Sequence, residues 1–78
     1  MSSQTKAINS FFRIALRDDV DGLLSKMVLT DRQYMIFEMK YLKGYDINYI
    51  ADTIGSSRTS VQSELRIIRN KIIRVLDI

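Results

Sequence analysis

The sequence predicts an all-α fold, a compact bundle of four or five helices. Its 78 residues include no Pro and only three Gly, so few positions interrupt a helix. Apolar residues recur at intervals of three and four along several stretches, which is the spacing of one helix face. A chain of this length is expected to form a single domain, residues 1–78, with a small core.

The N-terminal part, residues 6–28, is expected to be a helical extension, with residues 1–5 frayed. We expect a bend within Asp18–Gly22, where an Asp would cap a short second helix that ends near Met27. A helix that continues through this cluster is the alternative. The apolar stripe that begins this region consists of Ile8, Phe11, Phe12, Ala15 and Leu16.

A clearer start signal follows at Thr30. Thr30 and Gln33 have the spacing of a capping box, in which each side chain binds the backbone N–H of the other residue. A helix is therefore expected from this point, with Gly44 as its C-terminal stop. Its expected buried side consists of Ile36, Phe37, Met39, Tyr41 and Leu42.

Two more helices are expected around a turn at Gly55. Asp46 would cap the helix Ile47–Ile54, and Ser57 would cap a last helix that runs to about Leu76. Ile50, Ile54, Val61, Leu65, Ile68, Ile72 and Val75 would face the core. A short helix, a glycine turn and a second helix form a helix-turn-helix, the motif that places its second helix in a DNA major groove. Residues 29–76 are thus the predicted DNA-binding core.

The charge distribution favours the same interpretation. The net charge is +3, and residues 58–78 carry five basic and two acidic side chains. The remaining residues carry seven of each sign. The whole excess therefore lies on the last helix, as expected for an element that meets phosphates.

Residues 29–76 resemble the fourth region of bacterial sigma factors and the related LuxR/GerE-type DNA-binding domains. The matching positions are Leu29, Thr30, Arg32, Gln33, Ile36, Phe37, Tyr41, Leu42, Gly44, Ile50, Ala51, Ile54, Gly55, Ser57, Ser60, Val61, Ser63, Leu65, Ile68, Arg69, Lys71 and Ile72. Residues 1–28 are too short for the domain that precedes this region in sigma factors. We therefore do not expect the chain to act as a sigma factor on its own.

The resemblance implies that the first two turns of the last helix read base edges. The base-facing candidates are Arg58, Thr59, Gln62, Ser63 and Arg66. The phosphate-contact candidates are Arg32, Lys43, Ser57, Ser60, Arg69 and Lys71. Ser56 and Glu64 depart from the family pattern. Ser56 should anchor the turn less firmly than Ile or Val, and Glu64 should place a negative charge beside the DNA.

The expected function is sequence-specific binding of double-stranded DNA by a small transcription regulator. One copy would read only a few base pairs, so we expect either a homodimer on a palindromic site or recruitment by a larger partner. Ile73, Ile78, Phe11 and Phe12 are candidates for the dimer seam. An RNA polymerase-docking module with weak DNA binding is the main alternative, which Glu64 favours. A phage-type DNA-packaging subunit is a third alternative.

Other classes of function have little support. The chain lacks His and Cys, and it has no glycine-rich phosphate loop, so we expect neither an enzyme nor a cofactor. The cluster Asp18–Gly22 does not fit a calcium loop, because Arg17 would be the first ligand and Val28 the last. No apolar run is long enough for a membrane span or a signal peptide, and a cytoplasmic location is expected.

Overall fold

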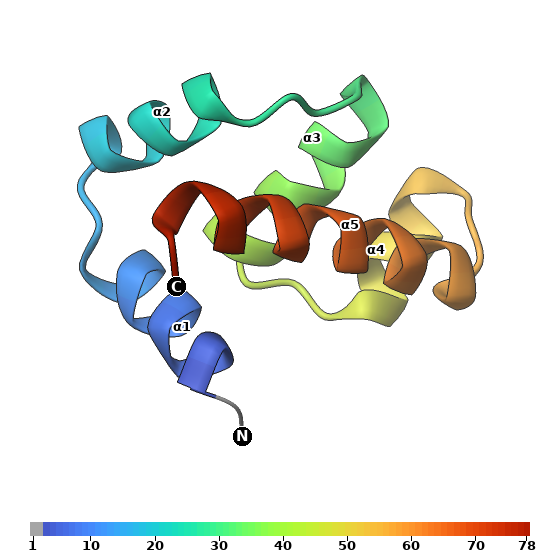
Figure 1. Cartoon of the computed structure of the whole chain (residues 1–78). Helices are drawn as coiled ribbons and strands as arrows, with labels where there is room; N and C mark the ends of the chain where they lie inside the picture. The colour runs from blue at the N-terminus through green and yellow to red at the C-terminus, as the bar shows by residue number, and fades with distance from the viewer. Residues whose placement is uncertain (1–2) are drawn as a thin grey trace. The chain divides into compact units, whose positions relative to one another are not determined.

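A computed structural model describes residues 3–78, and these residues contain helices but no strand. The all-α prediction is therefore confirmed, with five α-helices and one π-helical segment in the described residues. In chain order the elements are α1 Ser3–Ile14, α2 Arg17–Lys26, α3 Asp31–Phe37, η1 Glu38–Leu42, α4 Ile47–Ile54 and α5 Arg58–Leu76. Figure 1 labels α1 to α5 along the chain.

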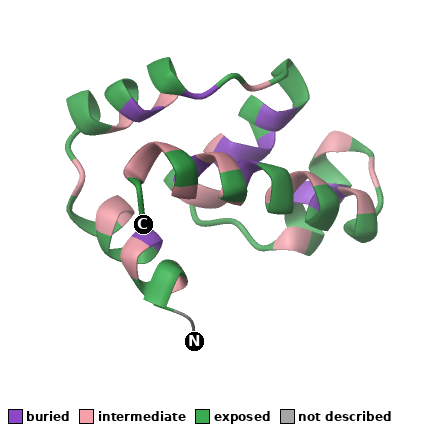
Figure 2. Ribbon diagram, viewed as in Figure 1, coloured by how far each residue is buried: buried purple, intermediate pink, exposed green. Residues whose placement is uncertain are grey.

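The chain divides into two units, and α5 contributes to both. One unit is Leu29–Arg69, and the other is Met1–Val28, described from Ser3 onward, together with Asn70–Ile78. Figure 2 shows buried residues in both parts of the chain. The first unit buries Ile36, Phe37, Met39, Ile50, Ala51, Val61 and Ile68, and the second buries Ile8, Leu23, Met27 and Ile72.

The predicted capping box begins α3. The Thr30 backbone N–H donates to Gln33 Oε1 at 3.1 Å, and the Gln33 backbone N–H donates to Thr30 Oγ1, also at 3.1 Å. Gln33 is buried, so this exchange satisfies polar groups that water does not reach. The first turn of α3, which includes Arg32, is therefore held firmly in place.

The segment after α3 is a π-helix rather than a continued α-helix. The Lys43 backbone N–H donates to the Glu38 carbonyl at 3.0 Å, five residues back along the chain. This wider turn shifts the side chains that follow Glu38 around the helix axis. The expectation that Leu42 is buried is wrong, because 44% of its surface is exposed. Tyr41 is half-buried against Phe37, with ring centroids 5.6 Å apart.

The caps and the turn of the helix-turn-helix lie where the sequence predicts them. Asp46 Oδ1 accepts the backbone N–H of Tyr49 at 2.8 Å, which caps α4. Gly55 ends α4 in the left-handed region, with φ 68° and ψ 39°. Ser57 Oγ then accepts the backbone N–H of Ser60 at 3.1 Å and caps α5. The motif is thus built from local signals at three successive points.

The N-terminal helices differ from the prediction. The break falls at Ala15 and Leu16, and Asp18–Gly22 lies inside α2. The Leu16 backbone N–H donates to Asp19 Oδ2 at 3.0 Å, so an Asp does cap α2, but from within its first turn. Leu16 lies between the helices with 72% of its surface exposed, and its predicted place on the buried stripe is wrong.

The start of α1 also corrects the prediction, because Ser3–Thr5 are helical rather than frayed. Met1 and Ser2 lie outside the described residues. Elsewhere in this unit, Gln4 Nε2 donates to the Ile78 carbonyl at 3.3 Å, and Lys71 Nζ donates to the Val28 carbonyl. These two bonds join residues 3–28 to the C-terminal segment Asn70–Ile78 of the same unit.

Candidate nucleic-acid interface

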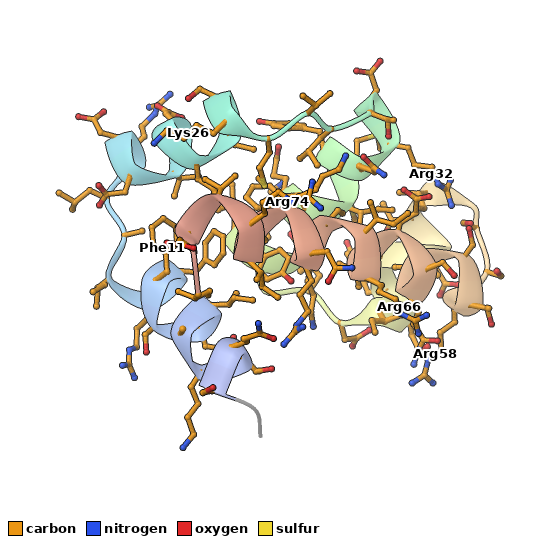
Figure 3. All side chains as sticks on the ribbon, viewed as in Figure 1. Phe11, Lys26, Arg32, Arg58, Arg66 and Arg74 are labelled. Atoms are coloured by element: carbon orange, nitrogen blue, oxygen red, sulfur yellow. The ribbon has the colours of Figure 1, made fainter. Side chains whose placement is uncertain are left out.

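The five base-facing candidates form an exposed face on the first turns of α5. All five side chains, those of Arg58, Thr59, Gln62, Ser63 and Arg66, are exposed. Figure 3 shows the Arg58 and Arg66 side chains on the same side of the helix. Residues four and eight positions apart lie on one side of an α-helix, so these two guanidinium groups bracket the face.

A different side of α5 packs in the core. Val61 and Ile68 are fully buried, and Leu65 is half-buried. Because these residues fix the rotation of the helix about its axis, they hold the five candidates in solvent. The spacing of apolar residues in the sequence already predicted this orientation.

The position of Glu64 differs from the prediction that its negative charge lies beside the DNA. Successive residues of an α-helix are about 100° apart around the axis, so Glu64 lies nearly opposite the middle of the Arg58–Arg66 face. It is half-buried, whereas the five candidates are exposed. The negative charge is therefore not on the Arg58–Arg66 face, and Glu64 no longer favours the polymerase-docking alternative.

Three of the phosphate-contact candidates meet at the turn before α5. Arg32 Nη2 donates to Ser60 Oγ at 2.9 Å, and Ser57 Oγ caps the same helix turn. The same Arg32 nitrogen also donates to Ser56 Oγ at 2.6 Å. Figure 3 shows the Arg32 side chain beside this turn. These bonds join residues that are 24 and 28 positions apart, and no local pattern in the sequence indicates them.

The other phosphate-contact candidates already have partners within the protein. Lys43 Nζ lies 3.6 Å from Glu38 Oε1, both on exposed or half-exposed side chains. Arg69 lies close enough to Tyr41 to act on its hydroxyl: burial raises the pKa of Tyr41, and the positive charge of Arg69 partly opposes that rise. Lys71 binds the Val28 carbonyl, and both of these residues belong to the unit that contains α1 and α2.

A hollow of about 320 Å³ lies beside α3, η1 and α4. Its lining residues are Met35, Glu38, Met39, Lys43, Tyr45, Tyr49 and Thr53. Met35 and Tyr49 are each about half exposed, and the rings of Tyr45 and Tyr49 meet edge to face at 4.7 Å. The sequence did not predict this apolar hollow, because its residues come together from α3, η1, the connection that follows η1, and α4.

A protein-family comparison matches residues 4–77 to the ECF sigma factor family. The chain belongs to that family. The match confirms the resemblance to the fourth region of sigma factors over residues 29–76. It also extends that likeness to the N-terminal helices α1 and α2, which the sequence motifs do not cover. Neither the curated proteins nor the solved structures include a significant match.

Membership of the ECF sigma factor family connects this chain with transcription, DNA and RNA polymerase. Among residues 3–78, no helix is both long and apolar enough to cross a membrane. Within the same residues, no three acidic side chains gather closely enough to hold a metal ion.

Proposed function

We propose that this ECF sigma factor chain binds duplex DNA in a sequence-specific manner as a small helix-turn-helix transcription regulator. The start of α5 would enter the major groove, and the activity would be binding without a catalytic step. The observation that carries the proposal is the exposed face of α5, whose rotation is set by buried Val61 and Ile68. Arg58 and Arg66 at its two ends suit the acceptor atoms of guanine.

Affinity and sequence preference would come from different residues. Arg58, Thr59, Gln62, Ser63 and Arg66 would contact base edges, whereas a second set would bind phosphates and give salt-dependent affinity. That second set consists of Arg32, Lys43, Ser57, Ser60, Arg69 and Lys71. Lys43 would exchange its exposed pairing with Glu38 for a phosphate at little cost, because exposed ion pairs contribute less than about 1 kcal/mol.

One copy of α5 would contact only a few base pairs, so a second binding element is part of the proposal. Either a homodimer would bind a palindromic site, or a larger partner would recruit the chain. For the homodimer, the candidate seam residues differ in exposure: Ile78 is 40% exposed, and Phe11, Phe12 and Ile73 are half-buried. The symmetry of the preferred DNA site would distinguish these two arrangements.

Selection from a randomised duplex library tests the proposal. The selected duplex and a scrambled duplex of equal length and composition would then be titrated at two salt concentrations. We expect both affinities to fall as salt rises, while the ratio between them persists. No enriched sequence, with affinity lost at the higher salt, would mean that α5 is only an electrostatic surface.

A second candidate function is docking on RNA polymerase with little DNA binding by this chain. The apolar hollow favours it, because Met35, Tyr45 and Tyr49 expose apolar area there of the kind that protein partners cover. Capture of purified RNA polymerase in the absence of DNA tests this function. We expect Tyr49→Ala to weaken such capture while Arg66→Ala leaves it unchanged. Loss with Arg66→Ala alone would exclude the hollow as the docking site.

A further inference from the structure

One guanidinium group connects three segments of the Leu29–Arg69 unit. Arg32 lies in the first turn of α3, which the Thr30–Gln33 capping box holds in place. Its Nη2 donates to Ser56 Oγ at 2.6 Å and to Ser60 Oγ at 2.9 Å. Ser56 follows Gly55 in the turn, and Ser60 lies in the first turn of α5.

Each of the two serines is itself fixed through its backbone. The Ser56 N–H donates to the Ala51 carbonyl of α4 at 2.8 Å, and the Ser60 N–H donates to the Ser57 cap at 3.1 Å. Both serines are half-buried, and the two bonds that their hydroxyl groups accept from Arg32 lie at the surface. A bond from Arg32 to both hydroxyls therefore restrains the backbone on either side of the turn.

We propose that Arg32 is a positioning residue that sets the DNA sequence preference of the chain. By holding Ser56 and Ser60, it would fix the start of α5 and hence the placement of the base-facing side chains. The proposal rests on the proposed DNA binding by α5. Arg32 would act on the DNA bases through α5, without touching them.

The geometry allows this role to be separated from a phosphate contact. An amino group of a guanidinium carries two hydrogens, and Nη2 of Arg32 directs them to Ser56 and Ser60. Three N–H groups, on Nε and Nη1, remain for a phosphate. Removal of the two serine hydroxyls therefore abolishes the positioning bonds and leaves the charge of Arg32 in place.

The test compares Ser56→Ala/Ser60→Ala, Arg32→Met and the triple variant with the natural chain. Ser25→Ala is the matched control, because it removes a hydroxyl that donates to the Gly22 carbonyl of its own helix, at 2.8 Å. Amide hydrogen exchange is measured on the free proteins at Ser56 and Ser60. The ratio of affinities for the selected and scrambled duplexes is measured at one salt concentration.

We expect the double-serine variant and Arg32→Met each to speed amide exchange at the turn by about three- to tenfold. The affinity ratio should fall by a similar factor. The triple variant should show the same exchange rate and the same affinity ratio as either of the other two variants, because all of these changes remove the same bonds. Ser25→Ala should leave both quantities unchanged, and the affinity of the double-serine variant should keep the salt dependence of the natural chain.

Three results would overturn the proposal. Unchanged exchange would show that the bonds do not restrain the turn. Faster exchange with an unchanged affinity ratio would show that this restraint does not set sequence preference. Additive losses in the triple variant would show that Arg32 and the serines act separately. If selection yields no preferred duplex, the proposed DNA function fails, and the role of Arg32 in sequence preference fails with it. In that case amide exchange still measures whether Arg32 restrains the turn.

Discussion

Replacing glycine with alanine should have opposite effects on stability at Gly55 and Gly22. Gly55 has φ 68°, and the left-handed conformation would cost Ala about 1–2 kcal/mol there. Lower entropy of the unfolded chain offsets about 0.4–1 kcal/mol of this. An added Cβ meets no atom within 4 Å, so no steric clash contributes. Gly55→Ala should therefore lower the free energy of unfolding by about 1 kcal/mol.

Gly22 is the matched control, because its added Cβ also meets no atom within 4 Å. It lies inside α2, where Ala is favoured over Gly by about 0.5–1 kcal/mol. Gly22→Ala should thus raise the free energy of unfolding. Urea unfolding followed by circular dichroism measures the free energy of unfolding of both variants. In thermal unfolding, each change of 1 kcal/mol would shift Tm by about 4–8 °C for a domain of this size. A change of the same sign in both variants would refute the reasoning.

Three further predictions concern single side chains. Asp46→Ala should destabilise the chain by about 1 kcal/mol in urea unfolding, because it removes the cap of α4; an unchanged midpoint would contradict that role. Ile68→Ala should cost about 2–5 kcal/mol in the same assay, since Ile68 is fully buried, and a loss below about 1 kcal/mol would place it outside the core. Burial raises the pKa of Tyr41, so ultraviolet titration should show a tyrosine that ionises above the ordinary tyrosine pKa, and this step should be absent in Tyr41→Phe. The stability that comes from keeping the buried Tyr41 hydroxyl neutral is complete below the ordinary tyrosine pKa, and it is lost as pH rises through the raised pKa of Tyr41. A gain in stability over that pH range would contradict the raised pKa of Tyr41.

The features that the sequence predicted correctly depend on neighbouring residues. The capping box at Thr30, the Asp46 cap, the Gly55 turn and the Ser57 cap each involve residues within a few positions of one another. The periodic apolar residues of α5 likewise determine its buried side from their spacing alone. The exposed face of α5 was predictable for that reason.

The features that the sequence did not reveal depend on distant residues or on backbone geometry. The bonds from Arg32 to Ser56 and Ser60 span 24 and 28 positions. The π-helical turn after Glu38 has no simple residue signature, yet it moves Leu42 to the surface. The sequence predicted a bend within Asp18–Gly22, whereas the helix break lies at Ala15 and Leu16. The prediction failed because the acidic cluster near Asp19 stabilises the beginning of α2 and does not interrupt a helix.

The most direct test of the central claim compares Arg66→Ala with Arg74→Ala. Both variants remove one exposed positive charge from α5, but Arg74 lies in its last turn, beyond the base-facing candidates. The measurement is the affinity of each variant for the selected and the scrambled duplex. Arg66→Ala should weaken binding to the selected duplex by about 1–3 kcal/mol and reduce the affinity ratio, while Arg74→Ala should preserve that ratio. Equal losses for both variants on both duplexes would contradict base reading by the start of α5.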